Sequence, residues 1–558
     1  MHLLSAKARP QLLEKLNTDH FDLTIIGGGI TGAGIALDAA SRGLKVALIE
    51  QRDFGSGTSS KSTKLIHGGL RYLKQFEVQL VREVGQERAT VHQLAPHLVL
   101  PEKMMLPLIK GGTYGPWATS IGLKVYDFLA GVKGKDQRKM LTREASITKE
   151  PLLRTNDLIG GGYYAEYRTD DARLTIENIK TAQDFGAVCA NYVQAKSFIY
   201  SPKNRIQGVN CQEVISGQEI KISSDYVISA AGPWVDQLRE KDNSLSGKHL
   251  FLSKGVHIVV PFEKLPLKQS IYFDNTDGRM LFAIPRGRST YIGTTDTPYE
   301  GDLNKIPITL EDVQYLLAAT QQMFPKTQLG RSDVESSWAG LRPLIYEAGK
   351  SGSEMSRKDE IFSAPSGLIS IAGGKLTGYR KMAERVIDFL GIYLAKDQNI
   401  TLPRSKTKSI PLAGGVLKNS AEVESFQKEI SQTVLALDLP KFYSGYLVAN
   451  YGAATTEILA KVFPMEKGEN PELKLLQSEL HYCLDFEGVL TAEDFLNRRT
   501  GRMYFNMPSV LAFKEEVLQA MQKALNWEEN RLADERQILE QAIELITTFP
   551  ETSKKVLA

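Results

Sequence analysis

The stretch that most constrains the fold of this chain is residues 21–50, with the sequence FDLTIIGGGITGAGIALDAASRGLKVALIE. It opens with a short apolar run that is rich in β-branched residues, which predicts a buried parallel strand. Helical spacing follows over 30–42, and 44–49 predicts a second buried strand. Between the first strand and the helix, three glycines form the pattern G-x-G-x-x-G: Gly27, Gly29 and Gly32. These parts make a complete βαβ unit of the dinucleotide-binding kind.

Each glycine has a physical reason in such a unit. Gly27 permits the tight turn, Gly29 lets the backbone approach a pyrophosphate, and Gly32 lets the helix lie close to the strand. The helix N-terminus adds free N–H groups and a partial positive charge. Glu50, at the tip of the second strand, can accept hydrogen bonds from ribose hydroxyls and disfavours a 2′-phosphate, which argues against NADP. The alternative is a glycine-rich turn in an ordinary doubly wound sheet. The unit alone does not separate FAD from NAD, although its N-terminal position favours FAD.

Chain length and cysteine usage restrict the class of protein. A chain of 558 residues is too long for one core and predicts two or three domains. Its three cysteines, Cys189, Cys211 and Cys483, include no C-x-x-C pair. This pattern predicts a reducing compartment and argues against a disulfide framework, an iron–sulfur cluster or a zinc site. The net charge of +3 does not indicate nucleic acid as a partner.

No segment has the pattern of a targeting or membrane-spanning sequence. The N-terminus has no long apolar core and no small-residue cleavage site, so we do not expect a secretory signal. No apolar run reaches about 18 residues, so we expect no segment that spans a bilayer. Peripheral attachment to a membrane stays open.

A loop rich in glycine, serine, threonine and lysine follows the acidic residue over 51–72. Its hydroxyls and backbone N–H groups can surround a pyrophosphate and a flavin ring, with Ser59 and Ser60 near its centre. A flexible surface linker is the alternative. The apolar pair Leu65 and Ile66 argues against a linker, because these side chains would anchor the loop inside the protein.

Several later segments are predicted to extend the sheet or to cover it. Buried strands over 186–195, 225–231 and 367–372 are assigned to the parallel sheet, with a hairpin-like excursion over 206–224. Short strands separated by turn residues follow over 256–294, and we expect them to be antiparallel. An antiparallel insertion in an α/β domain is typical of a substrate cap.

A second glycine turn and a helical tail complete the chain. Gly373 and Gly374 open a helix over 379–390, and this turn can also direct N–H groups at a cofactor. The remainder reads mainly as helices, which predicts a separate helical domain without a chemical motif of its own. Within it, Thr491 and Asp494 have the spacing of a capping box.

Seven motifs occur in one order along the chain: GGGITGAG, SSKSTKLIHGGLRYL, SAAGPWV, SKGVHIVV, YIGTTDTP, AGLRPL and GGKLTGYR. In this combination the chain resembles the FAD-dependent glycerol-3-phosphate dehydrogenases of the aerobic, respiratory type, within the wider D-amino-acid-oxidase-like flavoproteins. The likeness begins near Phe21 and includes the tail segment LTAEDFLNRRTGRMYF. Composition and spacing by themselves lead only to a dinucleotide-binding oxidoreductase.

The resemblance implies noncovalent FAD and the oxidation of sn-glycerol 3-phosphate to dihydroxyacetone phosphate, with electrons passed to the quinone pool. It implies a cytoplasmic enzyme on the inner membrane surface, attached peripherally, and leaves a homodimer open. The expected fold class is α/β, with a Rossmann-like FAD-binding domain, an antiparallel β-rich substrate cap and an all-α C-terminal domain. The expected domain bounds are 20–100, 150–245 and 335–395 for the FAD-binding domain, 101–149 and 246–334 for the cap, and 400–558 for the helical domain.

The family's substrate-contacting residues match this sequence at His67, Arg71, Tyr72, His257, Arg342 and Lys375. We assign the phosphate mainly to Arg342 and Arg71, because a guanidinium forms bidentate hydrogen bonds. Lys375 is expected near the flavin or the substrate oxygens, and His67 or His257 is expected to accept the proton. The expected cofactor-binding residues are Gly27, Gly29, Gly32, Glu50, Ser59, Ser60, Gly232, Gly374, Lys375, Leu376 and Thr377.

The structural alternatives are an ion-pair role for Arg342, core roles for the two histidines and a hairpin role for Asp296. Three competing functions also stay open. An oxidase would pass electrons to oxygen, but related oxidases carry an extra central segment that is not seen here. An amino-acid oxidase would need a carboxylate-binding arginine and tyrosine rather than this basic cluster. A non-catalytic flavin module would use the helical tail as an adaptor to a partner or a membrane.

Overall fold

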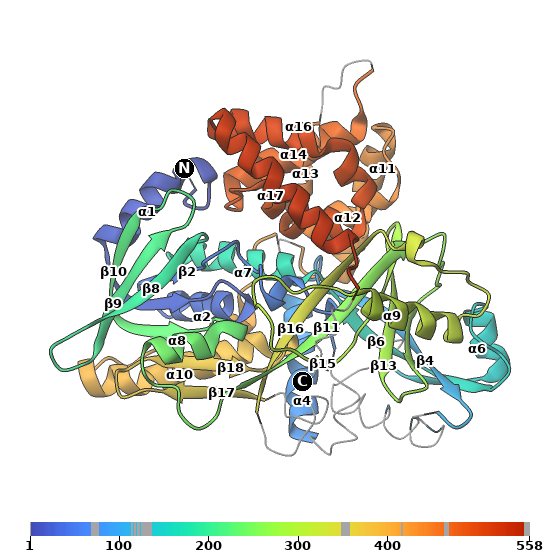
Figure 1. Ribbon diagram of the computed structural model, residues 1–558, viewed down its shortest axis with the longest axis horizontal. Helices are drawn as coiled ribbons and strands as arrows, with labels where there is room; N and C mark the ends of the chain where they lie inside the picture. The colour runs from blue at the N-terminus through green and yellow to red at the C-terminus, as the bar shows by residue number, and fades with distance from the viewer. Residues whose placement is uncertain are drawn as a thin grey trace.

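The computed structural model (Figure 1) describes residues 2–67, 78–112, 115, 119, 123, 137–346, 358–414, 417–462 and 468–551. The predicted site residues Arg71 and Tyr72 lie outside these residues. Two β-sheets lie toward opposite ends of the long axis, and the C-terminal helices cover them from above in Figure 1.

The first sheet contains the predicted βαβ unit. Its strands run in the order β17-β18-β10-β1-β2-β7, and β9 pairs with both β10 and β8. The pairs that join β1 to β2 and β10, β2 to β7, and β10 to β18 are parallel, as predicted. The predicted strand over 186–195 is divided, because only its first part, β7, is parallel, whereas β8 begins at Val193 and pairs antiparallel with β9. The strands are β1 (His20–Ile26), β2 (Val46–Ile49), β7 (Val188–Ala190), β8 (Val193–Tyr200), β9 (Ile206–Glu213), β10 (Glu219–Ser229), β17 (Asp359–Ser363) and β18 (Ile369–Gly373).

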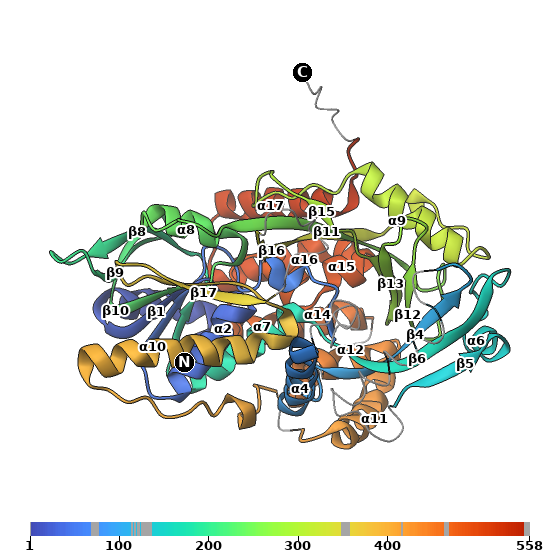
Figure 2. The ribbon, with the colours of Figure 1, turned by 90° about the horizontal axis from the view of Figure 1, so that it is seen from below.

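Helices flank this sheet. Helix α2 packs against both α7 and α10, and α1 packs on β10. Figure 2 shows α10 lying lengthwise beside this sheet. The helices that precede the C-terminal domain are α1 (Arg9–Thr18), α2 (Ile30–Ser41), α4 (Val78–Leu94), α6 (Arg143–Lys149), α7 (Asp171–Asp184), α8 (Val235–Lys241), α9 (Leu310–Met323) and α10 (Tyr379–Gln398).

Strand β10 corrects one sequence prediction. The hairpin segment and the buried parallel strand that were predicted separately are a single strand, Glu219–Ser229. Its first half pairs antiparallel with β9, whereas the part from Ser223 onward pairs parallel with β1. No glycine or proline separates the two halves, so one extended segment serves both neighbours. The antiparallel edge strand β17 was not predicted.

The second sheet forms the predicted cap. Its main path runs in the order β15-β11-β14-β13-β12-β4-β6-β3, with β16 beside β11 and β5 beside β6. Most neighbours are antiparallel as predicted, but β12 pairs parallel with β4. The strands are β3 (Leu65–Ile66), β4 (Leu100–Ile109), β5 (Lys139–Thr142), β6 (Leu158–Arg168), β11 (Leu250–Pro261), β12 (Ser270–Asp274), β13 (Met280–Arg286), β14 (Ser289–Gly293), β15 (Thr297–Pro298) and β16 (Ser336–Ile345).

Strands β3, β6 and β16 lie in this second sheet, although the predicted domain bounds assigned these three segments to the FAD-binding domain. Strand β16 pairs with β11 from the partners Leu250 and Ile345 to the partners Val259 and Ser336. Strand β6 pairs along the length of β4. Local sequence predicts that a segment is a strand but does not specify which sheet it joins, which explains the difference. The division into domains otherwise stays a prediction.

The C-terminal part is helical, in agreement with the predicted fold class. Hydrogen bonds between Thr491 and Asp494, of 3.0 and 3.2 Å, confirm the predicted capping box. No helix in the described part of the chain is long and apolar enough to cross a membrane. The helices are α11 (Ser420–Ala436), α12 (Phe442–Tyr451), α13 (Thr455–Ala460), α14 (Pro471–Phe486), a π-helix (Asp494–Arg499), α15 (Arg502–Phe505), α16 (Met507–Leu525) and α17 (Glu529–Thr547).

Candidate cofactor and substrate site

A cavity of about 1020 Å³ lies between the first sheet and the cap sheet. This volume is at the upper end of the range for small-molecule sites, roughly 300–1,000 Å³. One wall contains the segments that follow β1, β2, β10 and β18, which is the carboxyl edge where doubly wound sheets bind ligands. The opposite wall contains residues of β11, β13 and β16.

The first glycine turn has the backbone geometry that its sequence predicts. Gly27 has a φ of 118°, and a Cβ there would lie 2.5 Å from the carbonyl oxygen of Ala230. A Cβ on Gly32 would lie 1.8 Å from the carbonyl oxygen of Gly27. Gly32 therefore permits close packing of α2 on β1, and it is not among the residues that line the cavity. Gly27 and Gly29 do line it.

Glu50 lines the cavity and also holds the first turn. Its carboxylate accepts hydrogen bonds from the backbone N–H groups of Gly28, at 2.7 Å, and of Arg52, at 3.0 Å. Burial raises the pKa of Glu50, although these two hydrogen bonds oppose the shift. Contact between Glu50 and a ribose stays a prediction.

Two serines that were predicted together have different surroundings. The Ser59 hydroxyl lines the cavity and accepts a hydrogen bond of 2.9 Å from the backbone N–H of Ile30, in the first turn of α2. Ser60 is buried and is not among the cavity-lining residues. Its carbonyl oxygen instead accepts a hydrogen bond of 3.1 Å from Lys64 Nζ. The structure does not bring Ser60 to the cavity.

The ends of β10 and β18 contribute two further glycine turns. Gly232 has a φ of 54° and Gly374 a φ of 81°, so both need the left-handed backbone region. A Cβ on Gly374 would also lie 2.4 Å from the sulfur of Met382. Both glycines line the cavity, as do the three residues after the second turn: Lys375, Leu376 and Thr377.

His257 is placed on the cap wall by β11. Its Nε2 lies 3.0 Å from the Thr63 hydroxyl, and its ring stacks on Trp338 with centroids 4.7 Å apart. Burial, with nearby Arg342 and Lys64, lowers the pKa of His257 well below its usual value. The imidazole is therefore neutral at neutral pH.

Arg342 lies on β16, beside β11. Its guanidinium donates to the Thr294 hydroxyl at 2.7 Å and to the Thr295 carbonyl oxygen at 3.0 Å, and it pairs with Asp296 at 3.2 Å. About 22% of its side chain is exposed. A Cβ on Gly255 would lie 2.6 Å from the guanidinium, so the arginine in this position passes close to the backbone of β11. His257, Arg342, Lys375 and His67 all line this one cavity.

The sequence analysis did not predict a buried ion pair that involves Lys64, in the loop over 51–72. Lys64 pairs with Asp171, a cavity-lining residue that also accepts a 3.0 Å hydrogen bond from the backbone N–H of Ser62. The neighbouring Asp170 caps helix α7, because its carboxylate accepts a hydrogen bond from the backbone N–H of Arg173 at 3.2 Å. Two adjacent acids at the start of a helix were the available signal.

Lys61 is a second missed residue on the cavity wall. Burial, with nearby Arg52, lowers the pKa of Lys61 to about 8. It lies within the SSKSTK segment, but neither its place on the cavity wall nor its lowered pKa could be predicted from that pattern. An anion in the cavity would favour its charged form.

Comparison with known proteins identifies the family. Residues 22–380 match the family described as FAD dependent oxidoreductase, and residues 405–532 match the C-terminal domain of alpha-glycerophosphate oxidase. The chain belongs to the FAD-dependent oxidoreductases. It is 48% identical to the aerobic glycerol-3-phosphate dehydrogenase of Bacillus subtilis over 531 residues, which is 95% of each chain. Its identity to the enzyme of the same name from Staphylococcus haemolyticus is 47% over 530 residues, again 95% of each chain.

Solved structures agree with this placement. The glycerol-3-phosphate dehydrogenase of Bacillus halodurans, solved in complex with FAD, is similar with a TM-score of 0.82 and 42% identity over 98% of each chain. The L-alpha-glycerophosphate oxidase of Mycoplasma pneumoniae shares the fold, with a TM-score of 0.55 and 16% identity over 70% of this chain and 97% of its own. The resemblance drawn from the seven motifs is confirmed at the level of the family.

The cavity of this FAD-dependent oxidoreductase fits its cofactor. Glycine turns at the ends of three neighbouring strands, at Gly29, Gly232 and Gly374, present backbone rather than side chains to the cavity. The N-terminus of α2 lies at the first of these turns, where a pyrophosphate is favoured. Ser59, Glu50 and Thr377 add polar groups around the same space.

Proposed function

We propose that this protein oxidises sn-glycerol 3-phosphate to dihydroxyacetone phosphate and passes the electrons to a quinone. The observation that carries this proposal is the wall opposite the glycine turns, where a partly exposed arginine and a neutral histidine line one cavity. Full-length relatives named aerobic glycerol-3-phosphate dehydrogenase support the choice of substrate. When bound, FAD supplies the acceptor for the hydride that leaves C2 of the substrate.

Arg342 is proposed to bind the substrate phosphate. A phosphate close to a dianion must be matched by cations when it leaves water. The guanidinium keeps the planar fork that suits phosphate oxygens, and Thr294, Thr295 and Asp296 hold that fork in one orientation. Lys375 lines the same cavity and is proposed to add a second cation. Arg71 stays a proposal from the resemblance alone.

The two histidines are proposed to have different roles. A proton acceptor works best when its pKa lies near the working pH. His257 departs from this condition because its pKa is lowered well below the usual value. We therefore assign proton removal from the C2 hydroxyl to His67, and hydrogen bonding to the substrate oxygens to His257. The Thr63 hydroxyl, 3.0 Å from Nε2, orients the His257 ring.

Anaerobic reduction of the bound flavin tests the reaction class. The yellow holoprotein is mixed without oxygen with glycerol 3-phosphate, glycerol, other 2-hydroxy phosphates and a set of amino acids. We expect glycerol 3-phosphate to bleach the yellow colour of the flavin fastest, and glycerol to act weakly. Bleaching by amino acids alone would assign the protein to the amino-acid oxidases, and a flavin that no compound reduces would indicate a binding module.

The electron acceptor and the membrane site are proposed together. Quinones are dissolved in lipid, and the resemblance implies that they are reduced, so we propose a cytoplasmic enzyme bound peripherally to the inner membrane surface. The reduced enzyme should be reoxidised by a soluble quinone analogue much faster than by air. High salt or mild detergent should release it from membranes. Rapid reoxidation by oxygen with stoichiometric hydrogen peroxide would instead identify an oxidase.

A further inference from the structure

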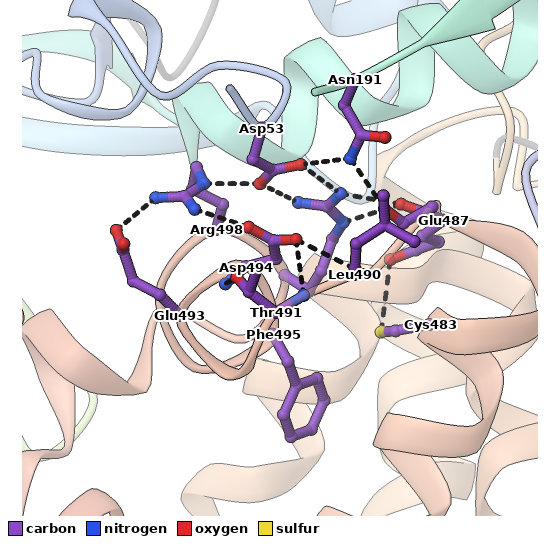
Figure 3. Close-up of polar contacts among 12 residues, drawn as sticks. Asp53, Asn191, Cys483, Glu487, Leu490, Thr491, Glu493, Asp494, Phe495 and Arg498 are labelled. Carbon is purple, nitrogen blue, oxygen red and sulfur yellow. Dashed lines mark hydrogen bonds and ion pairs between the residues drawn. The ribbon is translucent and has the colours of Figure 1, made fainter. Parts of the chain in front are cut away.

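A fully buried aspartate lies three residues beyond Glu50, in the loop that leads from the βαβ unit to the cavity (Figure 3). Asp53 Oδ1 accepts hydrogen bonds from Arg499 Nη2 at 2.8 Å and from Asn191 Nδ2 at 3.1 Å. Its Oδ2 accepts from Arg499 Nη1 at 2.7 Å and from Arg498 Nε at 2.5 Å. We call these four residues, Asp53, Asn191, Arg498 and Arg499, the Asp53 clamp.

The two arginines come from the C-terminal domain, more than 400 residues away along the chain. Both lie in the π-helix, and other groups of that domain accept hydrogen bonds from them. Figure 3 shows Arg498 between Asp53 on one side and Glu493 and Asp494 on the other. Arg498 donates to Glu493 at 2.7 Å and to Asp494 at 2.8 Å. Arg499 donates to the carbonyl oxygen of Glu487 at 2.8 and 3.0 Å. The two arginines of the clamp are therefore held by further hydrogen bonds within their own domain.

The residues after Asp53 connect the clamp to the first glycine turn. The backbone N–H of Gly55 donates to the carbonyl oxygen of Gly28 at 3.0 Å. Phe54 is 1% exposed, and a Cβ on Gly28 would lie 2.7 Å from its ring. Downstream of these residues the same loop lines the cavity through Ser56 and Gly57. The loop thus contacts the C-terminal domain through Asp53 and the cofactor turn through the next two residues.

We propose that the C-terminal domain positions the cofactor-binding loop, and that Asp53, Arg498 and Arg499 are positioning residues for FAD. Two arginines and an amide hold the buried carboxylate, so the loop cannot shift without leaving a buried charge unpaired. This constraint keeps Phe54 and Gly55 against Gly28 in the conformation that lines the cavity. The proposal rests on FAD occupying the cavity and not on the identity of the substrate.

A buried ion pair elsewhere in the same domain provides the matched control. Arg502 donates to Glu479 at 2.7 Å, and its side chain is 2% exposed. The other hydrogen-bond partners of its side chain, Tyr443, Glu472 and Ser509, all belong to the C-terminal domain. A variant at Arg502 weakens that domain without touching the cofactor loop.

The experiment compares the full-length holoproteins of Asp53→Asn, Arg498→Lys and the control Arg502→Lys. FAD release is followed after dilution by the rise in free-flavin fluorescence, and melting is measured with and without added FAD. We expect Asp53→Asn to release FAD about 10-fold faster or more, because hydrogen bonds to a charged group are lost. Arg498→Lys should show a smaller acceleration. In both, added FAD should raise the melting temperature less than in the wild type.

The control separates positioning from general stabilisation. Arg502→Lys should melt at a lower temperature but release FAD at the wild-type rate. If Asp53→Asn and Arg498→Lys only melt earlier and release FAD at the wild-type rate, the clamp merely joins two domains and the proposal is wrong. Should Asp53→Asn fail to fold, Arg498→Lys decides, because its ammonium keeps a charge beside Asp53. None of these readouts depends on which substrate the enzyme oxidises.

Discussion

Two arginine–aspartate pairs in this protein differ in surroundings and, we infer, in purpose. The pair of Arg499 and Asp53, 2.7 Å apart, has no exposed surface. The pair of Arg342 and Asp296, 3.2 Å apart, leaves 22% of the arginine and 16% of the aspartate side chain exposed at the cavity. An enclosed pair cannot exchange its partner for a ligand, whereas a pair at a cavity wall can bind one. An ion pair therefore does not by itself show that an arginine has a structural role, because a ligand-binding arginine can form one too.

The histidine on the same wall supports this comparison. His257 is as buried as a core residue and stacks on a tryptophan, yet it lines the cavity beside Arg342. Its environment keeps it neutral, whereas the environment of Arg499 raises the pKa of that guanidinium through nearby Asp53 despite burial. The contact between Asp53 and Arg499 thus stabilises the charged form of the arginine, whereas the surroundings of His257 at the cavity wall keep the imidazole uncharged.

The largest effect is expected from Arg499→Ala. Removing one partner of a buried pair leaves Asp53 poorly compensated, and this should lower the free energy of unfolding by about 3–5 kcal/mol. Urea denaturation of the holoprotein measures the loss. The matched control is Arg536→Ala, which removes an exposed pair with Glu515 in the same domain and should have little effect. Equal losses in the two variants would contradict the comparison.

A smaller effect, seen in kinetics rather than in stability, is expected from Arg342→Ala. Loss of a charge-assisted bidentate contact to phosphate should lower kcat/KM for glycerol 3-phosphate by roughly 10- to 200-fold. The free energy of unfolding should change by about 1 kcal/mol or less, since the pair is partly exposed and Ser253 still donates to Asp296. Steady-state kinetics and urea denaturation test the two parts.

Two further measurements sharpen the Arg342 prediction. Arg342→Lys should recover only part of the activity, because an ammonium keeps the charge but lacks the fork. The loss should be smaller for glycerol, which has no phosphate. Normal oxidation of glycerol 3-phosphate by the alanine variant, or its aggregation without FAD, would make Arg342 a structural residue like Arg499.

The smallest effect concerns acid stability. The pair of arginines lowers the pKa of Asp53 from 3.8 to about 2 despite burial. A lowered folded-state pKa contributes stability that is complete above pH 3.8 and is lost as the pH falls toward 2. This contribution is about 2 kcal/mol. Between pH 4 and pH 2, the free energy of unfolding measured by urea titration should therefore fall by about 2 kcal/mol more in the wild type than in Asp53→Asn. An equal fall in the two proteins would contradict a stabilising role for the Asp53 clamp.

Much of the first cavity wall could be predicted from sequence. The G-x-G-x-x-G pattern, the acid at Glu50 and the second glycine turn at Gly374 are local features, since a glycine with positive φ or a helix start depends on neighbours a few residues away. The same holds for the Thr491 capping box. The sequence analysis failed at β10, where one strand has both antiparallel and parallel neighbours, and at Ser60, which is buried and does not line the cavity.

By itself, then, the sequence determined the βαβ unit, the fold class and the family, because these follow from local spacing and from motifs in a fixed order. The tertiary structure decided the assignment of β16 to the cap sheet, the pairing of Arg342 with Asp296 and the burial that keeps His257 neutral. It also joined Asp53 to two arginines at the far end of the chain. Burial and partner choice arise from contacts between segments hundreds of residues apart, and no local pattern records which segments will meet.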